Sequence, residues 1–346
     1  MFSFSLFVKS TELTLIMNNT IFQLFIYSSL IIPLAILLGR TTNDLSDHLG
    51  DKLGGLLTST CGNLPELIMS IWSIRYGMIL MAKGALIGCI MSNMLLGLGI
   101  AIAVGGIKYK EQSFNKIIAR TNFSMLLLAL SALVILSALD RYAILTVGLK
   151  VSISFKAAIL LIGIYLLGLI FSLSTHKNLF LVKEIEGEKK KSNGKIMLKN
   201  IILICIISIL IYFISERLIG SAKNLIYEYD LSQAFLGIIL IPVLGNIGET
   251  ISTIISALRN KINLSIETAI GSSIQMALFV TPVLMIVSFF LGLNMNLMFP
   301  IFEITMTGVA VAMSYFVFQD GKSYWFEGAI LIASYILITI AFFYIG

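Results

Sequence analysis

Residues 61–70 read CGNLPELIMS, and residues 245–254 read GNIGETISTI. Each stretch carries a glutamate three residues after an asparagine, inside a segment that is otherwise nearly free of charge. Glu66 of the first stretch corresponds to Glu249 of the second, at an offset of 183 residues. The recurrence predicts an internal repeat that places an acid twice in equivalent apolar surroundings.

The composition predicts an all-α, polytopic membrane protein. The 346 residues are 58% hydrophobic and 12% charged, whereas soluble domains average about 45–50% apolar and 25% charged residues. Apolar runs of about 20 residues can cross a bilayer as helices, and no alternating pattern favours a membrane barrel. Ten such runs fall near residues 20–38, 53–74, 79–106, 118–139, 154–174, 200–219, 233–258, 264–292, 296–318 and 324–345.

A polar, Lys-rich stretch separates five runs from the other five. We expect a first five-helix repeat over 20–174, a cytoplasmic linker over 175–199 and a second five-helix repeat over 200–346. A unit with an odd number of spans enters the membrane from the opposite side the second time, so the repeats are expected to be inverted. Secondary transporters have this architecture, with the substrate at the midplane. Residues 1–17 are left open as a short extra span.

The net charge of +6 indicates membrane orientation rather than nucleic-acid binding. The basic residues lie between the apolar runs and form no stripe with interleaved aromatic residues. Most of the 24 Lys and Arg residues fall on the linker side of the predicted membrane, which makes that side cytoplasmic by the positive-inside rule.

The two recurring acids predict a cation site. A charged side chain at the bilayer centre costs roughly 2.5–3.5 kcal/mol, so Glu66 and Glu249 need either protons or a shared cation. Asn63 and Asn246 stand three residues before them, which places each Asn–Glu pair on one helix face. Calcium prefers six to eight oxygen ligands from carboxylates, amides, carbonyls and water. For one isolated acid, a protonated glutamate bonded to a backbone carbonyl is a simpler explanation than a cation site. For two matching acids it is a poor explanation.

Glycine and proline near both acids indicate broken helices whose freed carbonyls line a cavity. The next run of each half adds polar groups, since GCIMSN at 88–93 aligns with GSSIQ at 271–275. Ser92 then matches Gln275. Hydroxyl residues such as Ser92 and Ser272 either pack helices together or belong to the site. Gln275 is a large amide in an apolar run and needs polar partners.

These motifs resemble the calcium/proton antiporters, the CAX branch of the cation/calcium exchanger superfamily. The similarity covers about residues 39–345. The GTSLPE-type and GSNIFN-type repeats of the sodium/calcium exchanger branch are absent. The stretches that carry the resemblance are GGLLTSTCGNLPELIMS, GALIGCIMSNMLLGLG and GGIKYK in the first half, and LIPVLGNIGETIS, RNKINLSIETAIGSSIQMALFVTPVL and WFEGA in the second.

The resemblance implies a secondary active transporter that exchanges Ca²⁺ for H⁺ by alternating access, with two intramembrane glutamates competing for cation and protons. Ca²⁺ and protons are then the transported ions, and the lipid bilayer is a further partner of the protein. No resident cofactor is expected. A homo-oligomer is compatible with this interpretation. The expected metal-ligating residues are Glu66, Glu249, Asn63, Asn246, Ser272, Gln275 and Ser92.

Three positions depart from the family pattern. Thr250 stands where the family usually has His, Cys61 where it has Phe, and Cys89 where it has Ser. The missing His bears on proton coupling and metal preference. A Na⁺-driven exchanger, or an exchanger of another divalent cation within the same superfamily, is therefore the alternative.

The remaining polar residues indicate no enzyme. An intramembrane metalloprotease needs HExxH and an aspartyl protease needs paired membrane Asp residues, and neither pattern occurs. The three cysteines lack paired spacing and are expected to be small buried residues, and four further acids near span ends are expected to anchor at the interface. Short loops favour a multi-pass protein of a prokaryotic cell membrane, and a vacuolar-type membrane is the alternative. The three cysteines are Cys61, Cys89 and Cys205, and the four acids are Glu216, Glu267, Glu303 and Glu327.

Overall fold

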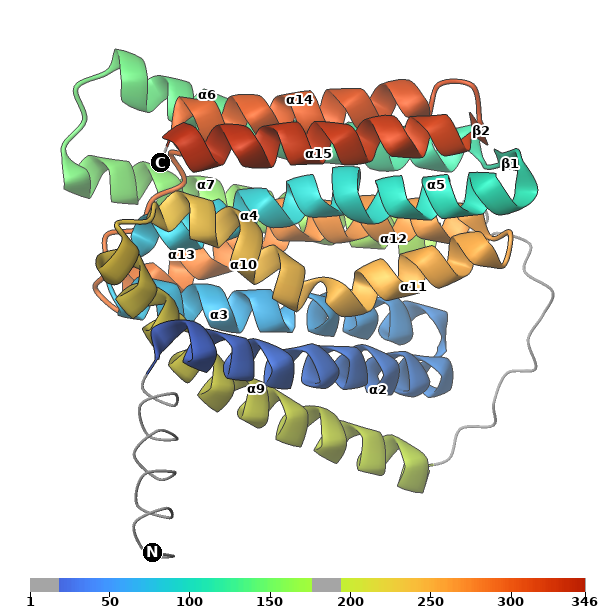
Figure 1. The fold of residues 1–346 in the computed structure, drawn as a ribbon, viewed down its shortest axis with the longest axis horizontal. Helices are drawn as coiled ribbons and strands as arrows, with labels where there is room; N and C mark the ends of the chain where they lie inside the picture. Colours follow the sequence, from blue (N-terminus) through green and yellow to red (C-terminus); the bar gives the residue numbers. More distant parts are fainter. Residues whose placement is uncertain (1–18, 176–193, 346) are drawn as a thin grey trace, which may run out of the picture.

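The computed structural model describes residues 19–175 and 194–345. The possible extra span at 1–17 and most of the linker lie outside this part of the chain. The structure is almost entirely helical, and Figure 1 shows the helices packed side by side. The all-α prediction is therefore confirmed.

The first half contains α2 (Thr20–Gly62), α3 (Leu64–Arg75), α4 (Ile79–Met91), the π-helical segment η1 (Ser92–Gly97), α5 (Leu98–Tyr109), β1 (Gln112–Ser113), α6 (Lys116–Tyr142), α7 (Val147–Ile170) and η2 (Phe171–Thr175). The second half contains α9 (Gly194–Tyr229), α10 (Gln233–Gly245), α11 (Ile247–Leu258), α12 (Ile262–Gln275), η3 (Met276–Val280), α13 (Thr281–Phe290), α14 (Ile301–Val317), β2 (Lys322–Ser323) and α15 (Trp325–Ile345). Because α9 begins at Gly194, the last residues of the predicted linker are helical and not part of a loop.

Seven helical stretches of the described chain are long and apolar enough to cross a membrane. The pair α10 and α11, bent by 58°, makes an eighth if it counts as one span. In α2 the apolar span covers only Thr20–Ser46, after which the chain reverses and returns towards α3 (Figure 1). The chain is thus a multi-pass integral membrane protein, as the composition predicts.

The most central spans are those that follow the two sequence motifs. In the α4–η1–α5 and α12–η3–α13 spans, 78% and 67% of the most apolar window is buried, against 11% in α9. α9 therefore lies at the periphery and presents apolar side chains outward. Cys205 is exposed on this helix, so its predicted burial is wrong, whereas Cys89 is buried and Cys61 is intermediate. All three cysteines are free.

Glycines set the close packing of α4 against α10. A Cβ at Gly84 would lie 2.7 Å from the carbonyl oxygen of Ala234, and a Cβ at Gly88 would lie 2.6 Å from the Cα of Ile238. Such approach of two backbones is possible only where one helix has no side chain, a common solution between membrane helices. This contact joins the first half of the chain to the second.

Helix bounds recur at the offset of the sequence repeat. α3 and α11 have equivalent bounds and begin directly after Asn63 and Asn246. Each follows a break, and the two helices leave their breaks in opposite directions (Figure 1). η1 and η3 also occupy matching places in the spans that follow.

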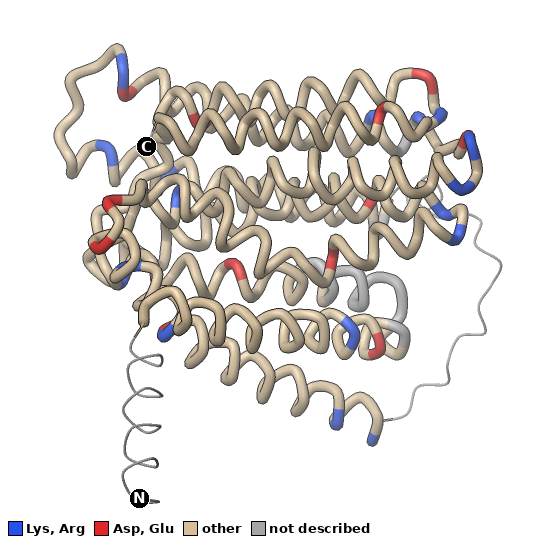
Figure 2. Tube along the Cα trace, viewed as in Figure 1, with Lys and Arg blue, Asp and Glu red and all other residues tan. Residues whose placement is uncertain are grey.

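Short strands join two loops at one end of the molecule. β1 pairs with β2 in an antiparallel register, with Gln112 opposite Ser323. Next to this pair, the ammonium of Lys322 lies 2.9 Å from the carboxylate of Glu111, and its hydrogen bond lowers the pKa of that carboxyl. Figure 2 shows several Lys and Arg residues gathered at this end, which is the end predicted to be cytoplasmic.

Candidate cation site

Both recurring acids lie in the first turn of a helix that follows a break. Asn63 ends α2 and precedes α3, so Glu66 is the third residue of α3, and Glu249 has the same place in α11. An Asn followed three residues later by Glu has the spacing of a capping box. Neither Asn63 nor Asn246 makes a side-chain cap bond, however. Their amides therefore remain free for contacts away from the helix end.

Each acid lies against the break of the other half. A Cβ at Gly245 would lie 2.6 Å from Oε1 of Glu66, and a Cβ at Gly62 would lie 2.7 Å from Oε1 of Glu249. The two carboxylates are close enough to interact electrostatically. Glu66 has 0% of its surface exposed. The fold thus brings together the two acids that the sequence pairs. Glu66 is fully buried, whereas Glu249 is half-buried with its Oε2 atom enclosed.

A hydrogen-bonded network of amides and one hydroxyl adjoins the acids. The amide nitrogen of Asn63 donates to Oε1 of Gln275 at 2.8 Å. Oγ of Ser272 donates to Oδ1 of Asn63 at 3.0 Å and accepts from Nδ2 of Asn93 at 3.0 Å. The network fixes the rotamers of four buried side chains from α2, α12 and η1. The amide oxygen of Gln275 thus has the polar partner that its place in an apolar run requires, whereas its amide nitrogen has none among the described residues.

Several buried polar atoms here have no hydrogen-bond partner in the described protein. They include both carboxylate oxygens of Glu66, Oε2 of Glu249 and both amide atoms of Asn246. Buried polar atoms are ordinarily paired, and leaving one unpaired costs about 1–3 kcal/mol. Four of these atoms are oxygens gathered around two helix breaks. They form a donor set suited to a hard cation or to protons.

The chemistry of the set favours an oxygen-liganded cation. Among the described residues, no group of three or more His, Cys, Asp or Glu side chains could hold a metal. Sites for zinc or other transition metals usually need such groups. Two carboxylates, an amide oxygen, backbone carbonyls at the breaks and water suit Ca²⁺, which tolerates irregular geometry.

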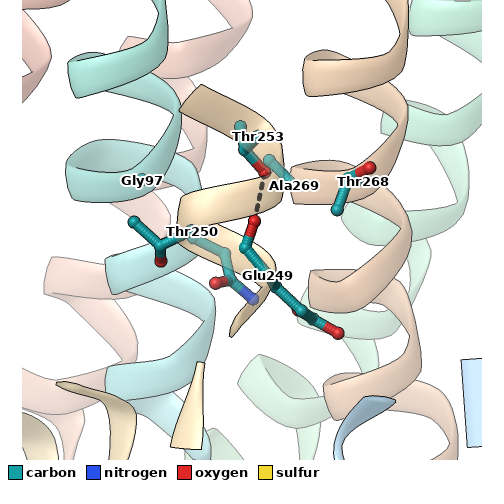
Figure 3. Close-up of a pocket in the computed structure, with 7 residues that line it drawn as sticks. Gly97, Glu249, Thr250, Thr253, Thr268 and Ala269 are labelled. Carbon is teal, nitrogen blue, oxygen red and sulfur yellow. Dashed lines mark hydrogen bonds between the residues drawn. The ribbon is translucent and has the colours of Figure 1, made fainter. Parts of the chain in front are cut away.

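A narrow recess leads to Glu249. Figure 3 shows Thr250, Thr253 and Thr268 lining it together with Glu249. Oγ1 of Thr253 donates to the backbone carbonyl of Glu249 at 2.8 Å, which holds that hydroxyl on its own helix. Thr250, at the position where the resemblance implies a His, also lines the recess. The polar wall of the recess therefore consists largely of hydroxyl groups.

One predicted residue lies beside the network and one unpredicted residue belongs to it. Ser92 is buried in η1, but in the described part of the site the hydrogen bond to Ser272 comes from its neighbour Asn93. Asn93 also lines the recess. The repeat could not indicate it, because Met276 occupies the equivalent place in the second half. Asn93 is, like Gln275, an amide side chain in an apolar run, and this feature of the sequence could have indicated it.

A second buried charged group lies away from this site. Lys83 of α4 is 6% exposed, and its ammonium donates to Oδ1 of Asn296 at 2.8 Å and to the carbonyl of Met298 at 2.6 Å. Glu303 in the first turn of α14 is 3% exposed and interacts electrostatically with Lys83. The prediction that Glu303 anchors at the interface is therefore wrong. The loop before α14 contacts Lys83 through Asn296 and Met298.

We expect Lys83→Met to destabilise the protein strongly. The substitution removes both hydrogen bonds of the Lys83 ammonium and leaves the oxygens of Asn296 and Met298 without this donor, which costs about 1–3 kcal/mol for each buried group. The apparent melting temperature of the purified variant in detergent should therefore fall by several degrees. Adding Glu303→Gln should recover part of this loss. Lys156→Met, at an exposed position of α7, is the control and should leave the melting temperature unchanged. Strict additivity of the two substitutions would show that the charges are not coupled.

Comparison with known proteins is consistent with these features. The family model described as sodium/calcium exchanger protein matches residues 20–174 and 199–344. The "Ca(2+)/H(+) antiporter" of Aphanothece halophytica is 37% identical over 337 residues, covering 93% of this chain and 90% of that protein. The "Ca(2+)/H(+) antiporter ChaA" of Bacillus subtilis is 34% identical over 326 residues, covering 92% and 91%.

Solved structures give the same result. The structure of native YfkE superimposes with a TM-score of 0.82 at 32% sequence identity, covering 95% of this chain and 94% of that one. At this identity the likeness extends beyond the general fold to a common family.

Proposed function

Because the chain belongs to the sodium/calcium exchanger protein family, and within it to the calcium/proton antiporters, we propose that it exchanges Ca²⁺ for H⁺ across a membrane. Relatives carrying the antiporter name are similar over almost their whole length. The observation that carries the proposal is the mutual contact of Glu66 and Glu249 with the helix breaks of the opposite halves. Members of this family are transporters rather than enzymes.

Electrostatics couples the two ions. Two carboxylates neutralise either one divalent cation or two protons. A doubly ionised site carrying neither would move two negative charges through the low-dielectric interior, at roughly twice the single-charge cost of 2.5–3.5 kcal/mol, or about 5–7 kcal/mol. Return of the unloaded site is therefore suppressed. After releasing Ca²⁺ on one side of the membrane, the site therefore returns to the other side only with protons bound.

We assign roles to the remaining site residues from their contacts. Asn246, whose amide atoms have no hydrogen-bond partner, supplies an oxygen ligand. Asn63, Ser272 and Gln275 form the supporting network, and any ligation by their oxygens requires rearrangement of its hydrogen bonds. Ser92 acts indirectly through the packing of η1.

The proposed architecture is two inverted five-helix repeats with ten spans, the first over 20–174 and the second beginning with α9 at Gly194, joined by a cytoplasmic linker. Equivalent helix bounds in the two halves support it, as do the opposite directions of α3 and α11 (Figure 1). Alternating access would follow from movement of part of the repeats around the fixed pair of acids. Glu249, Thr250 and Thr253 of the recess all lie on α11, and we propose a cytoplasmic route along this helix. The bacterial relatives fit a prokaryotic cell membrane.

A gradient-swap assay tests the exchanged ions. Purified protein in proteoliposomes should take up ⁴⁵Ca²⁺ when the lumen is acidic relative to the outside, and uptake should stop when a protonophore collapses the gradient. A Na⁺ gradient of equal size should drive none. Uptake driven by Na⁺ would instead support a Na⁺-driven exchanger, the alternative suggested by Thr250 in place of His. Competition by Sr²⁺, Mn²⁺ and Mg²⁺ in the same vesicles defines the preferred cation.

A further inference from the structure

A cavity distinct from the cation site lies between α6 and α14, near the paired strands. It has a volume of about 280 Å³. It lies at the basic end of the molecule, where the predicted spans emerge on the cytoplasmic side (Figure 2). Its lining consists of two basic residues, one amide and four mostly apolar residues: Lys116, Arg120, Gln319, Ala119, Phe123, Tyr315 and Phe318.

The two basic side chains in this cavity have no counter-ion among the described residues. Lys116 and Arg120 are four residues apart on α6, so they share one helix face, where like charges repel. The nearby Asp320 accepts a hydrogen bond from the backbone N–H of Lys322 through its carboxylate, and Lys322 pairs with Glu111. Two positive charges thus share a concave site without an acid, which favours an anion between them.

The fold fixes the position of Lys116. A Cβ at Gly321 would overlap the aliphatic stem of Lys116, so the stem lies directly on this turn residue, whose φ of +81° suits glycine. The carbonyl of Gly321 also accepts a hydrogen bond from the N–H of Phe114 at 2.9 Å. The loop before α6 and the turn before β2 are therefore joined at the cavity. A positioned lysine loses less conformational freedom when it binds a ligand.

Apolar surfaces lie directly beside the charges. Phe123 packs edge-on against Tyr315 and is tilted against Phe318, with both pairs of ring centroids 5.5 Å apart. Large apolar side chains further along α6, and one next to Tyr315 on α14, face outward, where a membrane protein meets lipid chains. They include Leu127, Leu128 and Ile135 on α6 and Phe316 on α14.

We propose that this cavity binds the phosphate headgroup of an anionic phospholipid from the cytoplasmic leaflet. Basic pockets between membrane helices on the cytoplasmic side suit such headgroups. The Arg120 guanidinium can bind two phosphate oxygens at once, and Lys116 adds a point charge. The acyl chains then lie along the exposed apolar faces of α6 and α14. This assignment depends on membrane embedding and not on which ions are exchanged.

Native mass spectrometry of the delipidated protein in detergent tests the proposal. Phosphatidylglycerol and phosphatidylcholine are added in separate titrations, with glycerol 1-phosphate as a soluble competitor. We expect tighter binding of phosphatidylglycerol, and about 25-fold weaker binding in the Lys116→Gln/Arg120→Gln variant, since each basic residue near an anionic headgroup contributes about a factor of five. The charge-conserving Lys116→Arg/Arg120→Lys variant should retain most of the binding.

A matched control removes two charges elsewhere at the same end. Lys110→Gln/Arg259→Gln changes the net charge equally, and both residues are exposed outside the cavity lining. This control should bind phosphatidylglycerol like the unmodified protein. Equal loss in both double variants, or equal binding of the two lipids, would overturn the proposal. Displacement of the lipid by millimolar glycerol 1-phosphate would instead assign the cavity to a free phosphate.

Discussion

Replacing either Glu66 or Glu249 by Gln is expected to reduce proton-driven ⁴⁵Ca²⁺ uptake about 100-fold. Gln keeps the size of the side chain but carries no charge and binds no transported proton. A site with one carboxylate and one Ca²⁺ has a net positive charge, whose passage through the membrane interior costs roughly 2.5–3.5 kcal/mol. This cost corresponds to a factor of about 60–300 in rate. The measurement is initial uptake into proteoliposomes at matched protein content.

Two further variants separate charge from geometry. Glu228→Gln changes an exposed acid of α9 and should transport normally. Gly245→Ala leaves both acids in place, but its Cβ must displace the carboxylate of Glu66, so uptake should fall at limiting Ca²⁺ and recover in part at high Ca²⁺. If Glu66→Gln retains uptake within threefold of the unmodified protein, Glu66 does not bind the transported ions.

The second large effect is expected at Gly88, in the contact of α4 with α10. In Gly88→Ala the new Cβ would lie 2.6 Å from Cα and 2.5 Å from the carbonyl oxygen of Ile238. These are backbone atoms, so the helices must separate. This carbonyl is also the one that Pro242, which has no N–H, leaves without its usual helical donor. Overpacking costs about 1–3 kcal/mol, and we expect the upper end. The apparent melting temperature in detergent should fall sharply.

The repeat supplies the control for this variant. Gly271 is equivalent to Gly88 at the offset of the repeat, yet a Cβ there would meet nothing within 4 Å. Gly271→Ala should therefore leave the melting temperature unchanged or raise it slightly, because alanine favours a helix. Equal stability of the two variants would mean that α4 and α10 do not rely on this close approach.

The sequence predicted the central acids because duplication made them visible twice. Helix type followed from the length of the apolar runs, and the breaks from Gly and Pro near the acids. Asn63, Ser272 and Gln275 were predicted near the acids, but their joining in one network was not. Asn93 was missed because an argument from repeats detects only what both halves share. The second half has methionine at that position.

The partnership of Lys83 and Glu303 could not be found in the sequence. Lysine near the end of an apolar run commonly extends to the interface, and so does glutamate at a helix start. The irregular segment before α14 contacts Lys83 near the start of α4, where Asn296 and the backbone carbonyl of Met298 accept hydrogen bonds from the ammonium. No local pattern encodes such a tertiary contact. The exposed Cys205 was mispredicted for a related reason, since apolar runs facing lipid and those facing protein look alike.

Because each glutamate packs against the glycine of the opposite half, the sequences of the two halves cannot diverge independently at these positions. An enlarged residue at position 62 would disturb the ion ligand of the later half, and one at position 245 that of the earlier half. Neither half can accumulate changes at this crossing independently. A chimaera with one half from a relative should therefore transport ions only if that half keeps two features. It needs its own glutamate, and it needs the small residue that contacts the glutamate of the other half.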